Sequence, residues 1–158
     1  MSPESRRLVA GVQFAGTLLG LLYFRGSVLT GPNWVGITSG VVFIAFIGAL
    51  AIGGTLLLRA HPWGVHMSAA LQAIQIPELA AHSLTYTLHG PFALSLGFAI
   101  NWDISFEADL STRLYIAVGK TPEVTSFSLN LFAVALLYVL LRSKAPKELP
   151  TVGGLVVR

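Results

Sequence analysis

Four apolar segments alternate with short polar stretches along the chain, and most of them end next to arginine or lysine. The segments cover residues 8–24, 34–58, 64–83 and 122–142. At a rise of 1.5 Å per residue, about 20 apolar residues cross the roughly 30 Å hydrocarbon layer of a bilayer. We therefore predict a membrane α-helical protein with four transmembrane helices, built as a single membrane domain of residues 1–158.

The third segment carries polar residues along one helical face. Pro77 predicts a kink there, because proline removes a backbone donor. At about 100° per residue, a third of the circumference holds Ser68, Gln72, Gln75, Glu78 and His82. Lipid does not solvate such a stripe, so we expect it to line a cavity or to face protein. Asn130 of the fourth helix is expected at the depth of Gln75, where the two amides would meet directly or through one water.

Small residues recur at intervals of about four along the first two helices, which the turn at residues 31–33 predicts to form a hairpin. The candidate helix-contact positions are Gly16, Gly20, Gly36, Gly40, Ala45, Ala49 and Gly53. Such ridges let helix backbones approach closely in lipid. The alternative is that glycine is simply common in membrane helices.

From residue 84 to 118 the period of the apolar positions becomes two. Leu94, Leu96 and Phe98 are apolar, for example, while the residues between them are small or polar. Alternation over this length predicts a small antiparallel β-meander of four strands, with turns at residues 89–91, 101–103 and 109–111. The alternative, a kinked helix continuing through residues 84–100, is disfavoured by the alternation and by Gly90-Pro91. An apolar sheet face must cover helix ends, lie on the bilayer or meet a partner, and free edges invite strand addition.

The positions of Lys and Arg predict the orientation. An orientation with both termini inside puts more basic residues in the cytoplasm than outside, as is usual for membrane proteins. The cytoplasmic basic residues are then Arg6, Arg7, Arg59, Arg142, Lys144, Lys147 and Arg158, and the outer ones are Arg25, Arg113 and Lys120. The meander is then extracytoplasmic, residues 145–158 form an irregular cytoplasmic tail, and a bacterial cytoplasmic (inner) membrane is the expected location. A signal peptide is the alternative for the first segment, although no small-x-small cleavage site follows Phe24.

Composition and motifs exclude several classes of chemistry. Only 11% of residues are charged, against about 25% in soluble domains. The chain has no cysteine, which excludes disulfides and thiolate metal sites. The sequence lacks a basic face for nucleic acid and the motifs of a metalloprotease helix and of a nucleotide-binding glycine loop. It also lacks a mid-membrane histidine pair for haem, so no cofactor is expected. Glu78 and His82, one helical turn apart, could share a metal ion or a proton, or could simply be solvated at the interface.

These observations favour an assembly role. We expect a small polytopic membrane protein that acts through protein–protein contacts, as a structural or accessory subunit or as a homo-oligomer. Its partners would be the bilayer and other membrane subunits or further copies of itself. The alternative is a ligand-binding or transport protein with a cavity lined by Gln72, Gln75, Glu78 and His82. A third possibility is an intramembrane enzyme, but a Ser-His-Asp set from the outer loops would lack a nucleophile elbow.

Overall fold

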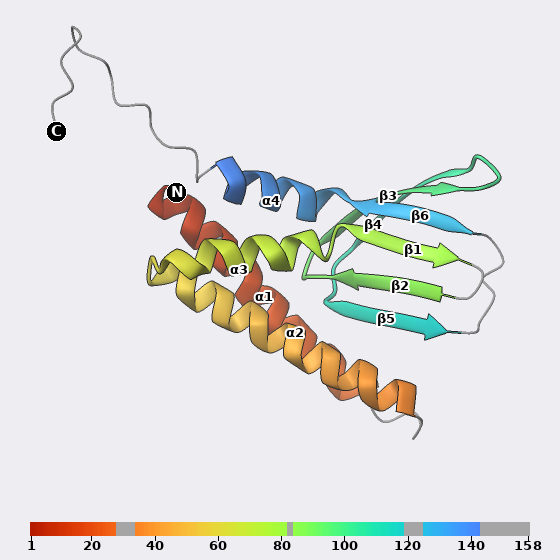
Figure 1. The fold of residues 1–158 in the computed structure, drawn as a ribbon, viewed down its shortest axis with the longest axis horizontal. Helices are drawn as coiled ribbons and strands as arrows, with labels where there is room; N and C mark the ends of the chain where they lie inside the picture. Colours follow the sequence, from red (N-terminus) through yellow and green to blue (C-terminus); the bar gives the residue numbers. More distant parts are fainter. Residues whose placement is uncertain (28–33, 82–83, 119–124, 143–158) are drawn as a thin grey trace, which may run out of the picture.

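The computed structural model describes residues 1–27, 34–81, 84–118 and 125–142 (Figure 1). Within these ranges the chain forms four helices and six strands. The helices are α1 (Pro3–Ser27), α2 (Trp34–Leu58), α3 (Pro62–Ala73) and α4 (Leu131–Arg142). The strands are β1 (Pro77–Ala81), β2 (Leu84–His89), β3 (Ala93–Ala99), β4 (Ile104–Asp109), β5 (Arg113–Val118) and β6 (Ser126–Asn130).

Among the described residues, two helices and not four are long and apolar enough to cross a membrane. They are α1, over Pro3–Phe24, and α2, over Ile37–Leu58. The helices α3 and α4 have 12 residues each, which is about 18 Å and well short of a hydrocarbon layer of about 30 Å. The prediction of four transmembrane helices is therefore wrong. The starts of α1 and α3 and the ends of α2 and α4 lie together at one end of the molecule (Figure 1).

The third predicted helix, residues 64–83, is wrong from Ile74 onward. The helix α3 ends at Ala73, the chain turns through Ile74 and Gln75, and Pro77 opens strand β1 instead of kinking a helix. Proline disfavours the helical conformation at the residue before it and is well placed as the first residue of a strand. Beyond it, β1 forms ladders with both neighbouring strands. The sheet thus supplies the hydrogen bonds that a longer helix would have made internally.

The fourth predicted helix, residues 122–142, is also wrong in its first half. Ser126–Asn130 reads Ser-Phe-Ser-Leu-Asn and forms β6, and α4 begins only at Leu131. The alternation of serine with apolar residues has the period of a strand. The helix begins where that alternation gives way to a continuous apolar run. Residues 122–124, where the predicted helix began, lie outside the described residues, as do His82 and the tail 145–158.

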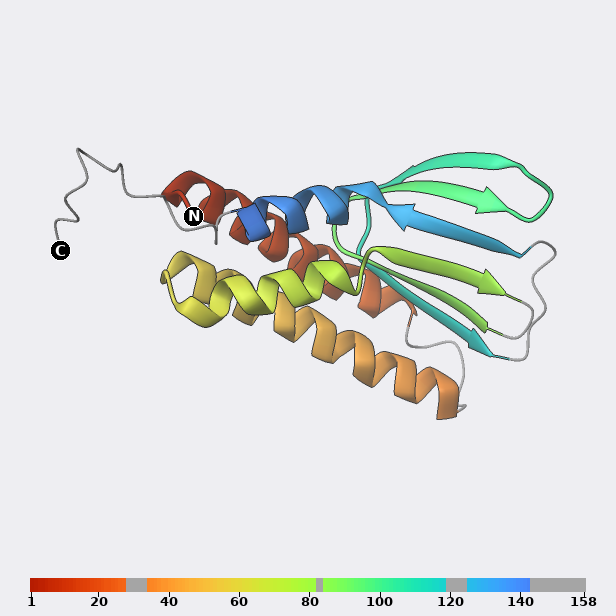
Figure 2. The ribbon, with the colours of Figure 1, turned by 45° about the horizontal axis from the view of Figure 1, so that its top comes forward.

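The strands within residues 84–118 lie where the alternation predicts them, but the sheet they join is larger. It has six strands in the order β4-β3-β6-β1-β2-β5, and every pairing is antiparallel. Only β1–β2 and β3–β4 pair with their neighbours in sequence, as strands of a meander do. The strands β1 and β6, hidden inside the two predicted helices, form the centre (Figure 2). The strand β1 follows α3 after the short turn at residues 74–76, and β6 runs directly into α4, so the sheet projects from the short helices (Figure 2).

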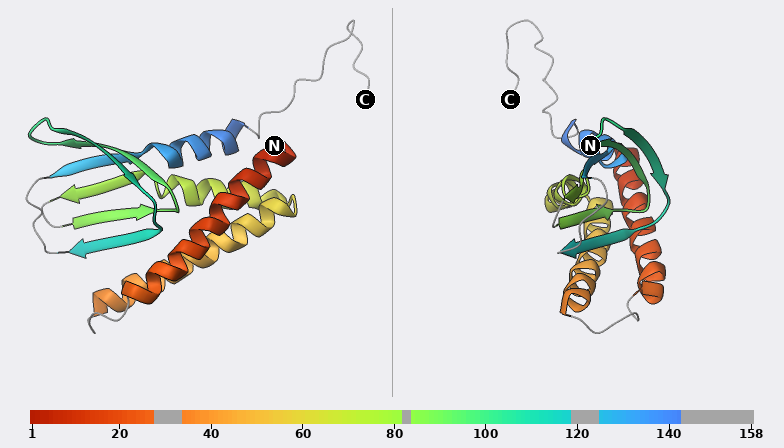
Figure 3. Two further views of the ribbon diagram at one scale, coloured as in Figure 1. Left: turned by 180° about the vertical axis from the view of Figure 1, so that it is seen from behind. Right: turned by 90° about the vertical axis from the view of Figure 1, so that its right-hand side faces the viewer.

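One face of the sheet is apolar, and the helices cover only part of it. Cross-strand register places Phe98 opposite both Ile104 and Phe127, and Tyr86 opposite Leu79, all on this face. Around β2, Leu88 joins a buried cluster whose other members, from α2 and α3, are Phe43, Phe46, Ile47, Leu50 and Leu71. A second cluster joins α1, α2 and α4 through Val9, Ala10, Leu57, Leu136 and Leu140. The sheet is strongly curved at the side formed by β3 and β4 (Figure 3).

Candidate functional site

A buried polar cluster lies among the helices and contains three residues of the predicted stripe. Ser68 and Gln72 of α3 and Gln75 just after it are buried, and so is Gln13 of α1, which the sequence reasoning did not single out. A Cβ on Gly53 of α2 would lie 3.2 Å from Gln13 Oε1 and 3.4 Å from Ser68 Oγ. The missing side chain at Gly53 therefore makes room for polar groups from two other helices.

The hydrogen-bonding capacity of this cluster is largely unused. Among the described residues, Gln13 Nε2, Gln13 Oε1 and Ser68 Oγ are buried without a hydrogen-bond partner. Gln75 is different, because its Nε2 donates to the Leu71 carbonyl at 2.7 Å. A narrow cleft, too tight here for a water molecule, is lined by Val12, Gln13, Leu50, Gln72, Gln75, Pro91, Phe92, Phe132 and Leu136. Buried polar atoms normally find partners, but this cleft has no room for even a water molecule, so these atoms could be satisfied only if the helices around them moved apart.

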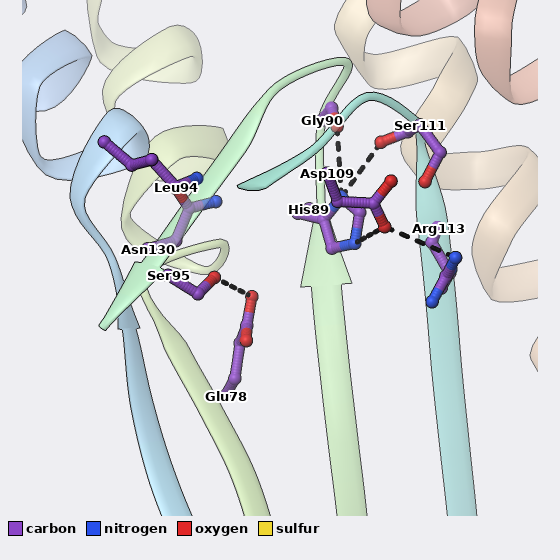
Figure 4. A network of polar contacts seen from close by, with 9 residues as sticks. All are labelled: Glu78, His89, Gly90, Leu94, Ser95, Asp109, Ser111, Arg113 and Asn130. Carbon is purple, nitrogen blue, oxygen red and sulfur yellow. Dashed lines mark hydrogen bonds and ion pairs between the residues drawn. The ribbon is translucent and has the colours of Figure 1, made fainter. Parts of the chain in front are cut away.

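Glu78 does not belong to this cluster. It lies on β1, and its Oε1 accepts a hydrogen bond from Ser95 Oγ of β3 at 3.0 Å, on the small-residue face of the sheet (Figure 4). The end of α3 before Pro77 breaks the helical stripe, so Glu78 is carried away from Gln72. His82 lies outside the described residues. Within the described ranges, no three histidine, cysteine or acidic side chains come close enough to hold a metal ion.

Asn130 acts as a helix cap and not as a partner of Gln75. Its Oδ1 accepts hydrogen bonds from the backbone N–H groups of Phe132 at 3.1 Å and Ala133 at 3.2 Å, and from that of Leu94 at 3.4 Å. Its backbone N–H donates to the Ile76 carbonyl at 2.9 Å. The residues around 75 and 130 are thus neighbours, as predicted, but the main chain joins them. The direct side-chain pairing is not made.

A second polar cluster joins three strand ends at the junction with the helices (Figure 4). His89 is buried; its Nδ1 lies 2.9 Å from the Ser111 carbonyl and 3.2 Å from the Gly90 carbonyl. Its Nε2 lies 3.5 Å from Asp109 Oδ2, which Arg113 also approaches at 3.3 Å. Because both neighbours of Nδ1 are acceptors, that nitrogen carries the proton. Both ring nitrogens of His89 thus lie against oxygen atoms of neighbouring residues, and the ring joins the ends of β2, β4 and β5.

The sequence placed His89 in the predicted turn at residues 89–91, from which it could approach Glu78 and His82, and did not predict this cluster. The signal was available in part, because two predicted turns, at residues 89–91 and 109–111, both fall at strand ends. What it did not reveal is that β2 pairs with β5, which places His89 opposite Arg113. Nearby, the buried Thr112 donates from Oγ1 to the Gly16 carbonyl of α1 at 2.9 Å. Tyr86 donates from its hydroxyl to the Ile74 carbonyl at 2.8 Å, and burial raises the pKa of that phenol.

Three of the small-residue positions, Gly16, Gly20 and Gly53, lie where α1 and α2 approach closely. A Cβ on Gly16 would lie 3.1 Å from Leu50 of α2, and one on Gly20 would lie 2.8 Å from Ile47 of α2. One on Gly40 would contact Phe24 at 3.8 Å. Ala49 packs against the buried cluster around Leu88, whereas Ala45 is exposed. The surroundings of Gly36 lie outside the described side chains.

An exposed apolar surface lies on the sheet, on and around the β3–β4 hairpin. Phe98, Ile104, Phe106 and Phe127 share the apolar face beyond the reach of the helices, and we call these four residues the apolar patch. Ile104 and Phe106 are 70% and 65% exposed. At the tip of the hairpin Trp102 is 92% exposed and has a backbone φ of 68°.

Comparisons with known proteins give no family for this chain, so its function is argued from the geometry described above. The chain matches no protein-family model, no curated protein and no solved structure.

Proposed function

We propose that this protein is a membrane-anchored assembly component, held in the bilayer by α1 and α2 and joined to another membrane protein or a further copy through its sheet. The observation that carries the proposal is the apolar patch. Single exposed apolar residues are ordinary on protein surfaces, but a contiguous group marks an interaction site. The patch belongs to one continuous apolar face, of which the part around Leu88 is already covered by α2. A partner would cover the remainder.

Trp102 supports the same proposal. A bulky residue with positive φ is uncommon and costs conformational energy. Here that residue is also 92% exposed, so its side chain gains little from packing within the chain. The turn that joins β3 to β4 imposes this backbone conformation, which glycine or asparagine would adopt at a lower cost. An exposed tryptophan at this position therefore supports an external role, and tryptophan is favoured at the centres of protein interfaces.

The arginines support an orientation. Arg6, Arg7, Arg59 and Arg142 lie at or near the helix ends that meet at one end of the molecule (Figure 1). Cytoplasmic flanks of membrane helices carry an excess of Lys and Arg. We therefore place this end in the cytoplasm, with the hairpin of α1 and α2 crossing toward the other side. The sheet leaves the short helices in that direction and would be reached by partners from the outer leaflet or the extracytoplasmic space.

Photo-cross-linking in native membranes tests the proposal. p-Benzoylphenylalanine at Phe106 should give one defined protein adduct. The same probe at Tyr138, which is 60% exposed on α4, is the matched control and should give none. Native mass spectrometry of the purified protein should show a stable stoichiometric assembly. A strictly monomeric protein that yields only lipid adducts at Phe106 would contradict an assembly role.

A second function, binding of a small neutral polar molecule, is favoured by the unpartnered atoms of Gln13 and Ser68, and it requires the helices around the cleft to move apart, because the cleft has no room for a water molecule. The two groups offer both donors and acceptors in a buried site, and no charged side chain lines the cleft. Native mass spectrometry of gently released protein should then show a small bound mass. Gln13→Leu removes both amide atoms and should abolish that mass, whereas Ala45→Leu, at an exposed site on α2, should not. Identical spectra for the wild type and Gln13→Leu would exclude this use of the cluster.

A further inference from the structure

The outer edge of β4 is the free edge of the sheet. Within the described part of the chain, β4 packs mainly on β3, and its residues from Ile104 to Ala108 are exposed on both faces. The opposite edge strand, β5, lies against α2, and its Leu114 packs against the buried cluster around Leu88 (Figure 3). A free edge presents unpaired N–H and C=O groups to any strand that approaches. The two edges therefore differ in how easily another chain can reach them.

The pairing of β3 with β4 fixes which main-chain groups point outward. The N–H of Ala99 donates to the carbonyl of Asp103 at 3.0 Å, at the start of the ladder. In an antiparallel ladder, hydrogen-bonded residues alternate along the strand. The odd-numbered residues of β4 therefore bond to β3. The N–H and C=O groups of Ile104, Phe106 and Ala108 point to the free edge.

We propose that β4 pairs antiparallel with β4 of a second copy of this chain, about a two-fold axis that passes beside Phe106. This deepens the proposed function and rests on it. In this register Phe106 faces Phe106 of the second copy, and Ile104 faces Ala108. All three outward-pointing residues meet outward-pointing residues, so the two strands form about six main-chain hydrogen bonds. The apolar faces of the two sheets join into one surface, because the register matches apolar with apolar.

Other registers are less favourable. A slip by one residue opposes an outward-pointing residue with an inward-pointing one and exchanges the faces. A slip by two toward the strand end puts Glu107 opposite Glu107 of the second copy, and like charges directly opposite repel. A slip of the two strands by two residues in the opposite direction leaves Ile104 opposite Phe106 of the second copy and few other paired residues. In the proposed register Glu107 faces the Ser105 hydroxyl, which can donate to its carboxylate. A two-fold contact also closes after two copies and leaves no β4 edge open.

Cysteine cross-linking tests the register directly, because the chain has no cysteine of its own. Hydrogen-bonded antiparallel pairs have Cα atoms about 5.5 Å apart, within the roughly 4.4–6.8 Å range of disulfides. Phe106→Cys should form a disulfide-linked dimer in native membranes under mild oxidation. Tyr115→Cys is the control, at a residue 47% exposed near the middle of β5, and should remain monomeric. A dimer through Tyr115→Cys only, or through neither, would overturn the β4 pairing.

A proline variant separates the edge from the rest of the fold. Phe106→Pro removes one outward N–H and no bond to β3, so the sheet should persist while the dimer is lost. The expected result is a shift from dimer to monomer in native mass spectrometry, with at least a tenfold weaker association. Phe106→Thr keeps the N–H and should retain more of the dimer.

The two proposals fail in different ways. If the photo-probe at Phe106 captures a different protein while Phe106→Cys gives no dimer, the assembly role stands and self-pairing is wrong. If the dimer of Phe106→Pro is as stable as that of the wild type, β4 is not the interface even though the protein self-associates. If there is neither an adduct nor a dimer, both proposals fall together.

Discussion

Asn130→Ala should destabilise the protein by about 2–3 kcal/mol. The Asn130 carboxamide oxygen caps α4 through Phe132 and Ala133 and also accepts from Leu94 of β3. Loss of an N-cap costs about 1 kcal/mol. Leaving the Leu94 N–H without its partner adds about 1 kcal/mol. Because Asn130 is fully buried, neither water nor a surface side chain replaces these bonds, and a small cavity adds to the loss.

Unfolding by SDS titration in detergent micelles, followed by far-UV circular dichroism, measures the change. Asn130→Ser is the matched control. It keeps a short side-chain oxygen that can accept the capping hydrogen bonds, and it adds no charge at this fully buried position. It should therefore cost clearly less than Asn130→Ala. If the alanine variant loses under about 0.5 kcal/mol, or if the two variants are equal, the capping role is refuted.

A double-mutant cycle with Gln75→Leu distinguishes this geometry from the side-chain pairing that the sequence suggested. Gln75 Nε2 donates within its own segment, to Leu71, and does not contact the Asn130 carboxamide. The losses of Gln75→Leu and Asn130→Ala should add to within about 0.5 kcal/mol. A coupling above about 1 kcal/mol would instead favour direct contact between the two amides.

Three further changes test other contacts. Gly64→Ala should cost about 1–3 kcal/mol, because its Cβ would lie 2.8 Å from backbone atoms of α2. Gly11→Ala, with open space at that position, should gain up to about 1 kcal/mol. Equal effects of the two changes in the same SDS titration would contradict this packing. Thr112→Val should lower the free energy of unfolding by about 1–2 kcal/mol, because the buried Gly16 carbonyl loses the Thr112 hydroxyl as a donor. An unchanged unfolding midpoint would exclude that hydrogen bond. Trp102→Gly should raise stability by about 1 kcal/mol, because glycine adopts positive φ without strain. It should also weaken assembly in native mass spectrometry. A stable variant with undiminished assembly would show that Trp102 is not part of the interface.

The local pattern determined the elements whose signal has one clear period. The continuous apolar runs predicted α1 and α2, and the alternation from residue 84 to 118 predicted β2 to β5 with their turns and their apolar face. In each case neighbouring residues within the element carry the signal, because side-chain direction repeats every 3.6 residues in a helix and every two in a strand. The sequence also placed Ser68, Gln72 and Gln75 on one buried surface, since α3 is helical for most of that span.

Tertiary structure decided where the short elements change type. Residues 77–81 and 126–130 were predicted to lie in helices, yet they are the two central strands. Pro77 and the alternation of serine with apolar residues at 126–129 were local signals against helix, but they are too short to define a strand without its partners. The strands β1 and β6 form hydrogen bonds with each other, and their other partners are β2 and β3. The paired residues of β1 and β6 are separated by 45 or more residues of sequence. The same long-range pairing brings His89 to Asp109 and Arg113, and separates Glu78 from Gln72. A backbone hydrogen-bond ladder forms between segments, and its free energy depends on partners that no local window contains.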